Sequence, residues 1–212
     1  MKFCIALILL GLTLISPTPA QTPSNPGILV TGDSLSAEYG LARGTGWVAL
    51  LASRLKQEGS PWEIMNASIS GETSAGGLSR LPKLLSQKKP KLVIIELGAN
   101  DALRGLPLAE TEKNIRTMVE LSKKSGAEVL LIGMQIPPNY GQEYTRQFAA
   151  LFTAIAKSQR VPLLPFFLEG VAQRNELFQV DRIHPNEAAQ PILFQNVWNA
   201  LAPFHAQLLK KN

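Results

Sequence analysis

A serine directly after a short apolar run is the residue of this chain whose position points most clearly to chemistry. The run Gly27-Ile28-Leu29-Val30 is followed by Thr31-Gly32-Asp33-Ser34-Leu35-Ser36, which indicates a strand that ends where the polar residues begin. We expect a helix next, so that the turn holds the Ser34 hydroxyl at the carboxyl edge of a sheet. A serine hydroxyl becomes a strong nucleophile only when a neighbouring base takes its proton.

Histidine is the side chain best suited to be that base near neutral pH, and the chain has two. His205 lies in a terminal segment with no carboxylate close to it in the sequence, whereas Asp181 precedes His184 by three residues. An aspartate at that spacing can accept the imidazole Nδ1–H, which leaves Nε2 to face the serine. An isolated Asp-x-x-His is more often a turn or a helix cap, but here it offers the only plausible base. We therefore predict that Ser34, Asp181 and His184 act together.

Attack on a carbonyl creates a negative oxygen that needs hydrogen-bond donors already in place. Asn100 offers a side-chain amide after a strand that ends at Gly98, and Gly71 offers a backbone N–H with no Cβ to block close approach. Ser34 can add its own N–H. Alone, Asn100 or Gly71 indicates only a turn or a loop. Each follows a predicted strand, however, and ligands of parallel sheets bind beyond the carboxyl ends of the strands.

Apolar segments of strand and helix type alternate along the chain. Their order predicts an α/β fold with a mainly parallel sheet of five strands, covered by helices on both faces. The expected strands are residues 28–31, 62–67, 92–97, 129–134 and 161–164, and the expected helices are residues 47–58, 77–87, 110–125, 145–158 and 186–201.

Composition argues against several other classes of protein. The net charge of +5 comes from scattered basic residues without interleaved aromatic residues, which disfavours nucleic-acid binding. Cys4 is the only cysteine, so disulfides and cysteine-bound metals are excluded, and no carboxylate cluster suggests another metal site. A glycosidase built on Asp33 and Asp101 would leave Ser34 and His184 without a role. We expect Asp33 to cap the helix after Ser34, and Asp101 to form structural hydrogen bonds behind Asn100.

The N-terminus has the pattern of a secretory signal peptide. Lys2 precedes an apolar stretch over residues 3–15, and Thr18-Pro19-Ala20 is a suitable cleavage site. We expect a signal peptide over residues 1–20, a flexible lead over 21–26 and one domain over 27–212. An uncleaved membrane anchor is the alternative, although the stretch is short for a span of roughly 20 residues. Cleavage near Ala20 would make the protein periplasmic or secreted.

These segments together resemble the SGNH (GDSL) hydrolase family across nearly all of the mature chain. The matching blocks are Gly32-Asp33-Ser34-Leu35, Gly71, Gly98-Ala99-Asn100-Asp101 and Asp181-Arg182-Ile183-His184-Pro185. Intervening segments resemble the branch with periplasmic acyl-CoA thioesterases, lysophospholipases and arylesterases. The resemblance implies a flavodoxin-like three-layer α/β/α fold and no cofactor. It implies Ser34 as nucleophile, His184 as base, Asp181 as its partner, and Ser34, Gly71 and Asn100 as oxyanion donors.

The expected activity is hydrolysis of acyl esters and thioesters, including lysophospholipids, through an acyl-enzyme. The alternatives are a carbohydrate acetylesterase with the same triad and a non-catalytic acyl-chain-binding module. The loops over residues 73–81, 102–108 and 135–140 are expected to form the acyl pocket, with Gly76 and Gly77 letting the first loop move. A monomer that contacts lipid only transiently is expected. The candidate pocket residues are Leu78, Leu103, Leu106, Ile136 and Pro137. Glu38 and Glu72 depart from the family pattern, which bears on substrate preference.

Overall fold

The computed structural model describes residues 27–209, with side chains up to residue 201. The predicted signal peptide and lead therefore lie outside the described residues, as does the side chain of His205. A five-stranded sheet forms the centre of the fold, and all its strands are parallel, in the order β2-β1-β3-β4-β5. The strands are β1 (Ile28–Gly32), β2 (Ile64–Asn66), β3 (Leu92–Glu96), β4 (Glu128–Ile132) and β5 (Leu163–Leu164).

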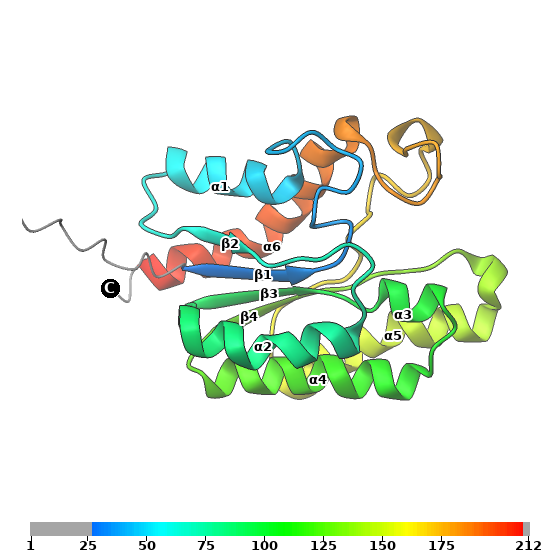
Figure 1. The fold of residues 1–212 in the computed structure, drawn as a ribbon, viewed down its shortest axis with the longest axis horizontal. Coiled ribbons are helices and arrows are strands. Elements are labelled where there is room, and N and C mark those ends of the chain that lie inside the picture. Colours follow the sequence, from blue (N-terminus) through cyan, green and yellow to red (C-terminus); the bar gives the residue numbers. More distant parts are fainter. Residues whose placement is uncertain (1–26, 210–212) are drawn as a thin grey trace, which may run out of the picture.

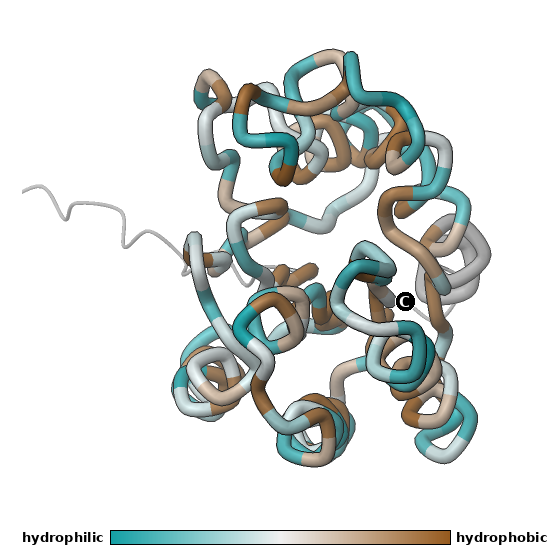
Figure 2. The backbone as a smooth tube through the Cα atoms, turned by 90° about the vertical axis from the view of Figure 1, so that its right-hand side faces the viewer, coloured by the Kyte–Doolittle hydropathy of each residue, from teal (hydrophilic) through white to brown (hydrophobic). Residues whose placement is uncertain are grey.

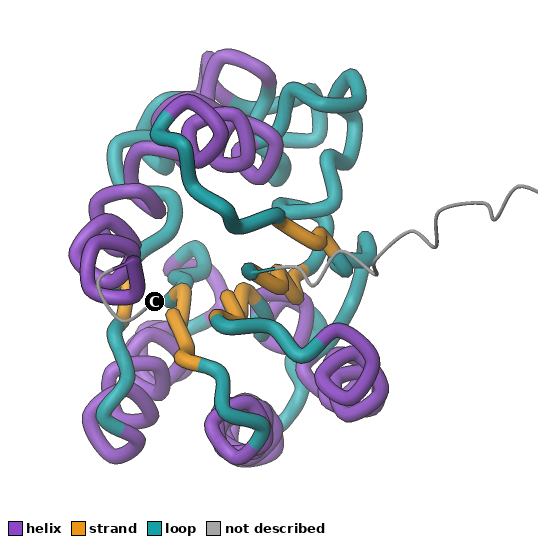
Figure 3. Tube along the Cα trace, turned by 90° about the vertical axis from the view of Figure 1, so that its left-hand side faces the viewer, coloured by secondary structure: helices purple, strands orange, loops and turns teal. Residues whose placement is uncertain are grey.

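Helices cover both faces of the sheet, which confirms the three-layer α/β/α architecture. Helices α1 and α6 lie on one face and α2, α4 and α5 on the other (Figure 1). The end-on view of Figure 3 shows the strands between the two helical layers. The α-helices are α1 (Trp47–Gln57), α2 (Ser74–Lys88), α3 (Ala99–Leu103), α4 (Leu108–Lys124), α5 (Gln142–Gln159) and α6 (Gln190–Leu209), and the short 3-10 helices are η1 (Pro138–Tyr140), η2 (Asn175–Leu177) and η3 (Glu187–Ala189).

Strands β1 and β3 are buried because both of their faces are covered. Every residue of β1 and β3 is buried, including the charged Glu96 at the end of β3. On either side of the sheet, aromatic side chains pack edge to face. Trp47 meets Phe167 at 5.6 Å between ring centroids, and Phe148 meets Phe152 at 5.3 Å. Within residues 27–209, no helix combines the length and the apolar character needed to cross a bilayer.

The segment after β1 is a correction to the sequence prediction. Residues 34–40 form turns, and the first helix begins only at Trp47. Asp33 therefore caps no helix; its Oδ1 accepts the Leu35 N–H at 2.9 Å inside the turn. Short helix α3, which carries Asn100, was also not predicted, because five residues are too few to show a helical apolar pattern.

The prediction that Gly76 and Gly77 lie in a mobile loop is also wrong. Helix α2 begins three residues earlier than predicted, at Ser74, because the Thr73 side chain accepts the Gly76 N–H and caps it. Gly77 is buried so closely that an added Cβ would lie 2.3 Å from Leu97. These glycines thus serve close packing within a helix.

The strand order places β1 at the point where the chain reverses direction across the sheet. From β1 the chain first adds β2 on one side and then crosses to β3 on the other. Ligand sites of open α/β sheets lie beyond the carboxyl ends of the strands at such a switch point. Ser34 follows β1 and Asn100 follows β3. Figure 2 looks onto this edge, with the loops beyond the strand ends toward the viewer.

Candidate active site

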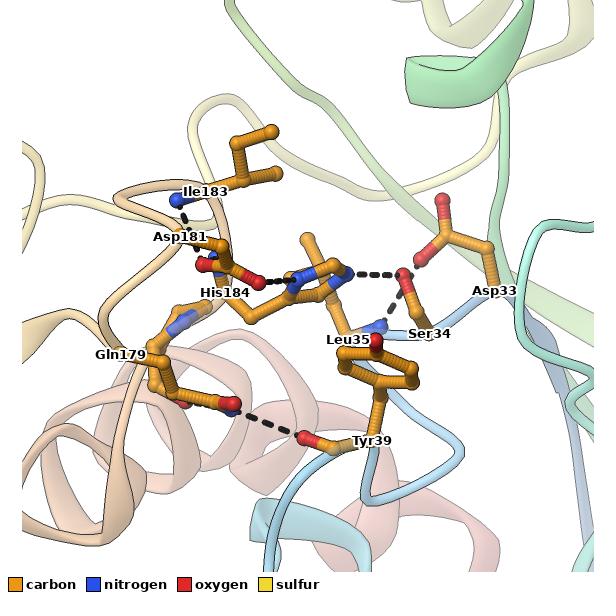
Figure 4. Close-up of polar contacts among 9 residues, drawn as sticks. Asp33, Ser34, Leu35, Tyr39, Gln179, Asp181, Ile183 and His184 are labelled. Atoms are coloured by element: carbon orange, nitrogen blue, oxygen red, sulfur yellow. Dashed lines mark hydrogen bonds and ion pairs between the residues drawn. The ribbon is translucent and has the colours of Figure 1, made fainter.

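Ser34, His184 and Asp181 form a continuous hydrogen-bonded chain. The Ser34 hydroxyl lies 2.9 Å from His184 Nε2, and His184 Nδ1 lies 2.6 Å from Asp181 Oδ2 (Figure 4). Ser34 and His184 are 150 residues apart in the sequence, so only the fold brings them together. The spatial convergence expected of these three residues is present.

Asp181 fixes both the ring and the backbone of His184. Its Oδ1 accepts the backbone N–H groups of Ile183 at 2.9 Å and His184 at 3.0 Å, while Oδ2 faces the imidazole. The His184 backbone N–H, followed by the ring and the Ile183 N–H, lowers the pKa of Asp181 to about 2. Asp181 is therefore a carboxylate at neutral pH and holds the proton on Nδ1. That tautomer leaves the Nε2 lone pair facing the Ser34 hydroxyl.

A second set of contacts ties the His184 loop to the turn that carries Ser34. Gln179 Nε2 donates to the Tyr39 carbonyl at 2.8 Å, and the Gln179 N–H donates to the His184 carbonyl at 2.8 Å. The Tyr39 ring lies against the His184 ring, with 4.4 Å between centroids (Figure 4). Tyr39 and Gln179 were not predicted from the sequence, because nothing in their spacing links them to the histidine.

The three candidate oxyanion donors differ in what their N–H groups do. Asn100 Nδ2 already donates to Asp33 Oδ2 at 3.0 Å and to the Glu72 carbonyl at 3.1 Å. Among residues 27–209, no hydrogen bond engages the backbone N–H of Ser34 or of Gly71. Gly71 has a φ of 78°, which suits glycine, and Arg104 donates to its carbonyl at 2.9 Å. Neither amide therefore has a competing acceptor among the described residues.

Two carboxyl groups are buried beneath the Ser34 turn. Asp33 is 1 % and Glu96 2 % exposed. Burial raises the pKa of Asp33 to about 6. Burial, followed by the charge of Asp33, raises the pKa of Glu96 well above its ordinary value. In the sequence, Glu96 stood out only as a charged residue inside an almost continuous apolar run. That was the signal that could have marked it for attention.

Asp101 has the structural role predicted for it. Its carboxylate accepts hydrogen bonds from the Ser74 N–H at 2.8 Å, the Ser74 hydroxyl at 2.5 Å and the Thr111 hydroxyl at 3.3 Å. These bonds join α3 to the starts of α2 and α4. Asn100, the preceding residue, is thereby held at a fixed place above the end of β3.

A cavity of about 550 Å³ opens beside the triad, a size typical of small-molecule sites. Ser34, His184, Asn100 and Asp33 border it, but Gly71 does not. Of the predicted acyl-pocket residues, Leu103, Ile136 and Pro137 line the cavity, whereas Leu78 and Leu106 do not. The sequence analysis missed the apolar lining residues Leu35, Ala99, Met134, Pro138, Phe166, Leu168, Ala172, Phe178 and Ile183.

The two residues that depart from the family pattern have structural partners outside the cavity. The Glu38 carboxylate accepts the N–H groups of Gly44 at 3.0 Å and Gly46 at 2.8 Å. Glu72 forms a salt bridge with Arg80 at 2.7 Å. Neither glutamate borders the cavity. Among the described residues, no group of three or more His, Cys, Asp or Glu side chains could hold a metal ion.

Comparison with known proteins agrees with this geometry. A sequence model of the GDSL-like Lipase/Acylhydrolase family matches residues 30–191. The chain is 50% identical over 200 residues to Esterase TesA of Pseudomonas aeruginosa, covering 94% of this chain and 95% of that protein. It is 43% identical over 176 residues to Thioesterase 1/protease 1/lysophospholipase L1 of Escherichia coli K12, covering 83% of each.

A solved structure of an esterase has a similar fold. The psychrotrophic esterase EstA from Pseudoalteromonas sp., inhibited by monoethylphosphonate, superposes with a TM-score of 0.80 at 42% identity. The match covers 84% of this chain and 97% of that one. By sequence, by fold and by the arrangement of its polar residues, the chain belongs to the GDSL-like lipase/acylhydrolase family.

Proposed function

We propose that this chain is a carboxylic ester hydrolase that cleaves acyl esters and thioesters through an acyl-enzyme on Ser34. The observation that carries the proposal is the Ser34–His184–Asp181 chain, with contacts of 2.9 and 2.6 Å. It places an activated hydroxyl at the border of a mainly apolar cavity. The names of the relatives agree, since one is called an esterase and another a thioesterase and lysophospholipase.

In the first step, the Ser34 hydroxyl gives its proton to His184 Nε2 as the oxygen attacks the acyl carbon. His184 then gives that proton to the departing alcohol or thiol as the bond to the acyl carbon breaks. In the second step, water gives a proton to the same nitrogen and attacks the acyl-enzyme. The proton returns to the Ser34 oxygen as the acid leaves. Asp181 stabilises the imidazolium during both steps because its carboxylate contacts Nδ1.

The negative oxygen formed in each step is proposed to bind the N–H groups of Ser34, Gly71 and Asn100. The two backbone amides are free for this role. The Asn100 side-chain amide already donates both of its hydrogens, one to Asp33 and one to the Glu72 carbonyl. The hydrogen now directed to Glu72 must therefore be shared with the oxyanion. Preorganised donors of this kind contribute about 3 kcal/mol each to the stability of the transition state.

The cavity favours medium or long acyl groups over acetyl. Most of its lining is apolar, with side chains such as Leu103, Met134, Phe166 and Phe178. Each methylene moved from water into such surroundings contributes about 0.8 kcal/mol. A carbohydrate acetylesterase with the same triad would need polar groups for the sugar and little room for the acyl chain. An acyl-binding module would hold the chain without turnover.

An acyl-length series tests the proposal and separates these alternatives. Purified mature protein is assayed with p-nitrophenyl esters from acetyl to palmitoyl and with the matching acyl-CoA thioesters. We expect kcat/KM to rise from acetyl to octanoyl, and Ser34→Ala to abolish turnover of both ester classes. A preference for acetyl would support the acetylesterase, binding without hydrolysis would support the binding module, and full turnover by Ser34→Ala would exclude the mechanism.

We further propose that the protein is exported, cleaved near Ala20 and monomeric in the periplasm or outside the cell. The support is the pattern of residues 1–20, with a basic start, an apolar stretch and a small-residue cleavage site. The mass of the protein recovered from the periplasm and the medium should correspond to a chain starting at Gln21. Light scattering should give the mass of one chain. A full-length protein retained in the membrane would instead support the uncleaved anchor.

A further inference from the structure

Glu96 is a buried acid that the proposed mechanism does not use. It pairs with Gly32 in the sheet, one residue before Asp33. Glu96 Oε2 accepts the Ser36 hydroxyl at 2.7 Å and the Asp33 N–H at 3.3 Å. The Asp33 and Glu96 carboxyl groups are neighbours in the interior, 1 % and 2 % exposed. Two adjacent buried carboxylates are strongly disfavoured, so we expect the pair to hold one proton.

We propose that Glu96 is a positioning residue, kept as the neutral acid so that Asp33 beside it remains the anion that orients the Asn100 amide. The inference rests on the proposed ester hydrolysis at Ser34 and deepens it. It assigns a role to a residue that contacts neither the substrate nor the triad.

The hydrogen-bond partners decide which of the two acids carries the proton. Asp33 accepts the Leu35 N–H through Oδ1 at 2.9 Å and the Asn100 amide through Oδ2 at 3.0 Å. Both oxygens of Asp33 are thus acceptors, as an anion prefers. Glu96 has its two recorded acceptor contacts on Oε2 alone. The other oxygen of Glu96 accepts neither of these bonds, so we assign the proton to it.

Charge within the pair supports a single proton on the two acids. The Asp33 charge acts on Glu96 and raises the pKa of the Glu96 carboxyl. Burial raises the pKa of both acids. Two buried carboxylates in contact are strongly disfavoured, so a single shared proton is the stable state.

The pair connects directly to the groups that perform the chemistry. Glu96 holds the backbone of Asp33 and the side chain of Ser36, and Ser34 lies between these two residues. Asp33 holds Asn100, the side-chain donor proposed for the oxyanion. Loss of the neutral Glu96 should therefore displace the nucleophile and the donor together. A displacement of about 1 Å at such a site can cost on the order of a hundredfold in rate.

Three variants separate the proton assignment from a general packing role. Glu96→Gln mimics the neutral acid, since its amide donates to Asp33 and its oxygen accepts from Ser36. Glu96→Met keeps the volume but removes every hydrogen bond. Asp33→Asn neutralises the proposed anion. With p-nitrophenyl octanoate, we expect Glu96→Met to lower kcat by roughly 10- to 100-fold with KM within about threefold, and Glu96→Gln to restore most of the loss. Asp33→Asn should lower kcat by about tenfold or more.

The opposite pattern, with Asp33→Asn active and Glu96→Gln impaired, would place the proton on Asp33 and overturn the inference. Equal loss in Glu96→Gln and Glu96→Met would overturn it too, because the neutral mimic would have failed. Infrared spectroscopy of the wild type at pH 7 supplies a readout independent of activity. A protonated-carboxyl band that disappears in Glu96→Gln supports the assignment, and its persistence contradicts it. If the wild type fails to hydrolyse any ester, the proposed function fails, while the infrared band still tests the proton.

Discussion

Replacing Asp181 by asparagine should invert the role of His184 while leaving the loop intact. The asparagine oxygen can still accept the N–H groups of Ile183 and His184, which Asp181 Oδ1 accepts at 2.9 and 3.0 Å. The new amide group takes the place of Oδ2, 2.6 Å from Nδ1. Because that group donates a hydrogen bond, Nδ1 must become the acceptor and the ring proton moves to Nε2. His184 can then no longer accept the Ser34 proton.

The magnitude follows from this change of tautomer. In a serine–histidine–aspartate triad with intact geometry, the wrong tautomer lowers kcat by about ten-thousandfold. The Asp181 side chain is 36% exposed, so water can partly replace the aspartate. We therefore expect Asp181→Asn to lower kcat by roughly a thousandfold to ten-thousandfold, or about 4 to 5.5 kcal/mol in the activation free energy.

The assay measures kcat and KM for p-nitrophenyl octanoate, together with the free energy of unfolding in urea. Asp181→Asn should unfold within about 0.5 kcal/mol of the wild type, whereas Asp181→Ala should lose about 1 kcal/mol because two backbone N–H groups lose their acceptor. Glu187→Gln, a loss of charge at an exposed residue of η3, is the matched control and should keep kcat within about twofold. If Asp181→Asn retained more than a tenth of the wild-type kcat, Asp181 would not be needed to hold the proton on Nδ1 of His184.

Three further predictions concern stability and substrate length. Asp101→Ala should lower the free energy of unfolding by about 3 kcal/mol, because buried Ser74 loses its acceptor; urea unfolding measures this, and a loss below about 1 kcal/mol would contradict it. Glu96 has a raised pKa, so above its ordinary value of 4.5 the native wild type keeps a proton that the unfolded chain releases, and its stability falls as pH rises. Glu96→Gln removes this pH dependence. The free energy of unfolding of Glu96→Gln minus that of the wild type should therefore increase from pH 4.5 upward, by at most about 1.4 kcal/mol per pH unit. A difference in urea unfolding that stays constant with pH would contradict this. Leu103→Ala should lower kcat/KM for the octanoyl ester by roughly 5- to 30-fold and leave the acetyl ester nearly unchanged, whereas Leu106→Ala, outside the cavity, should affect neither; equal effects of the two variants would show that the cavity does not hold the acyl chain.

The meeting of Ser34, Asp181 and His184 could be predicted from the sequence because the signals of these residues are local. Asp181 and His184 are three residues apart in the sequence. Ser34 and Asn100 each follow a strand that can be predicted from a run of apolar residues. A parallel sheet then places such residues at one edge, whatever the details of the loops. The same reasoning identified Asp101 as a structural hydrogen-bonding residue.

The predictions that were wrong or missing concern features that depend on contacts between residues far apart in the sequence. Gly76 and Gly77 suggested a loop, but the Thr73 cap and the close packing against Leu97 make them helical. The partnership of Tyr39 with His184 arises from a turn that replaces the expected helix after β1. The walls of the cavity come from several loops whose relative placement no periodic pattern encodes.

Chemical capture of the acyl-enzyme tests whether Ser34 is the nucleophile. Purified protein is mixed with p-nitrophenyl octanoate, quenched in acid within milliseconds and digested for mass spectrometry. We expect an octanoyl group on the peptide that carries Ser34, located on that serine, and no such group in Ser34→Ala. Octanoyl found on another residue, or steady turnover by Ser34→Ala, would contradict the claim that Ser34 attacks the substrate.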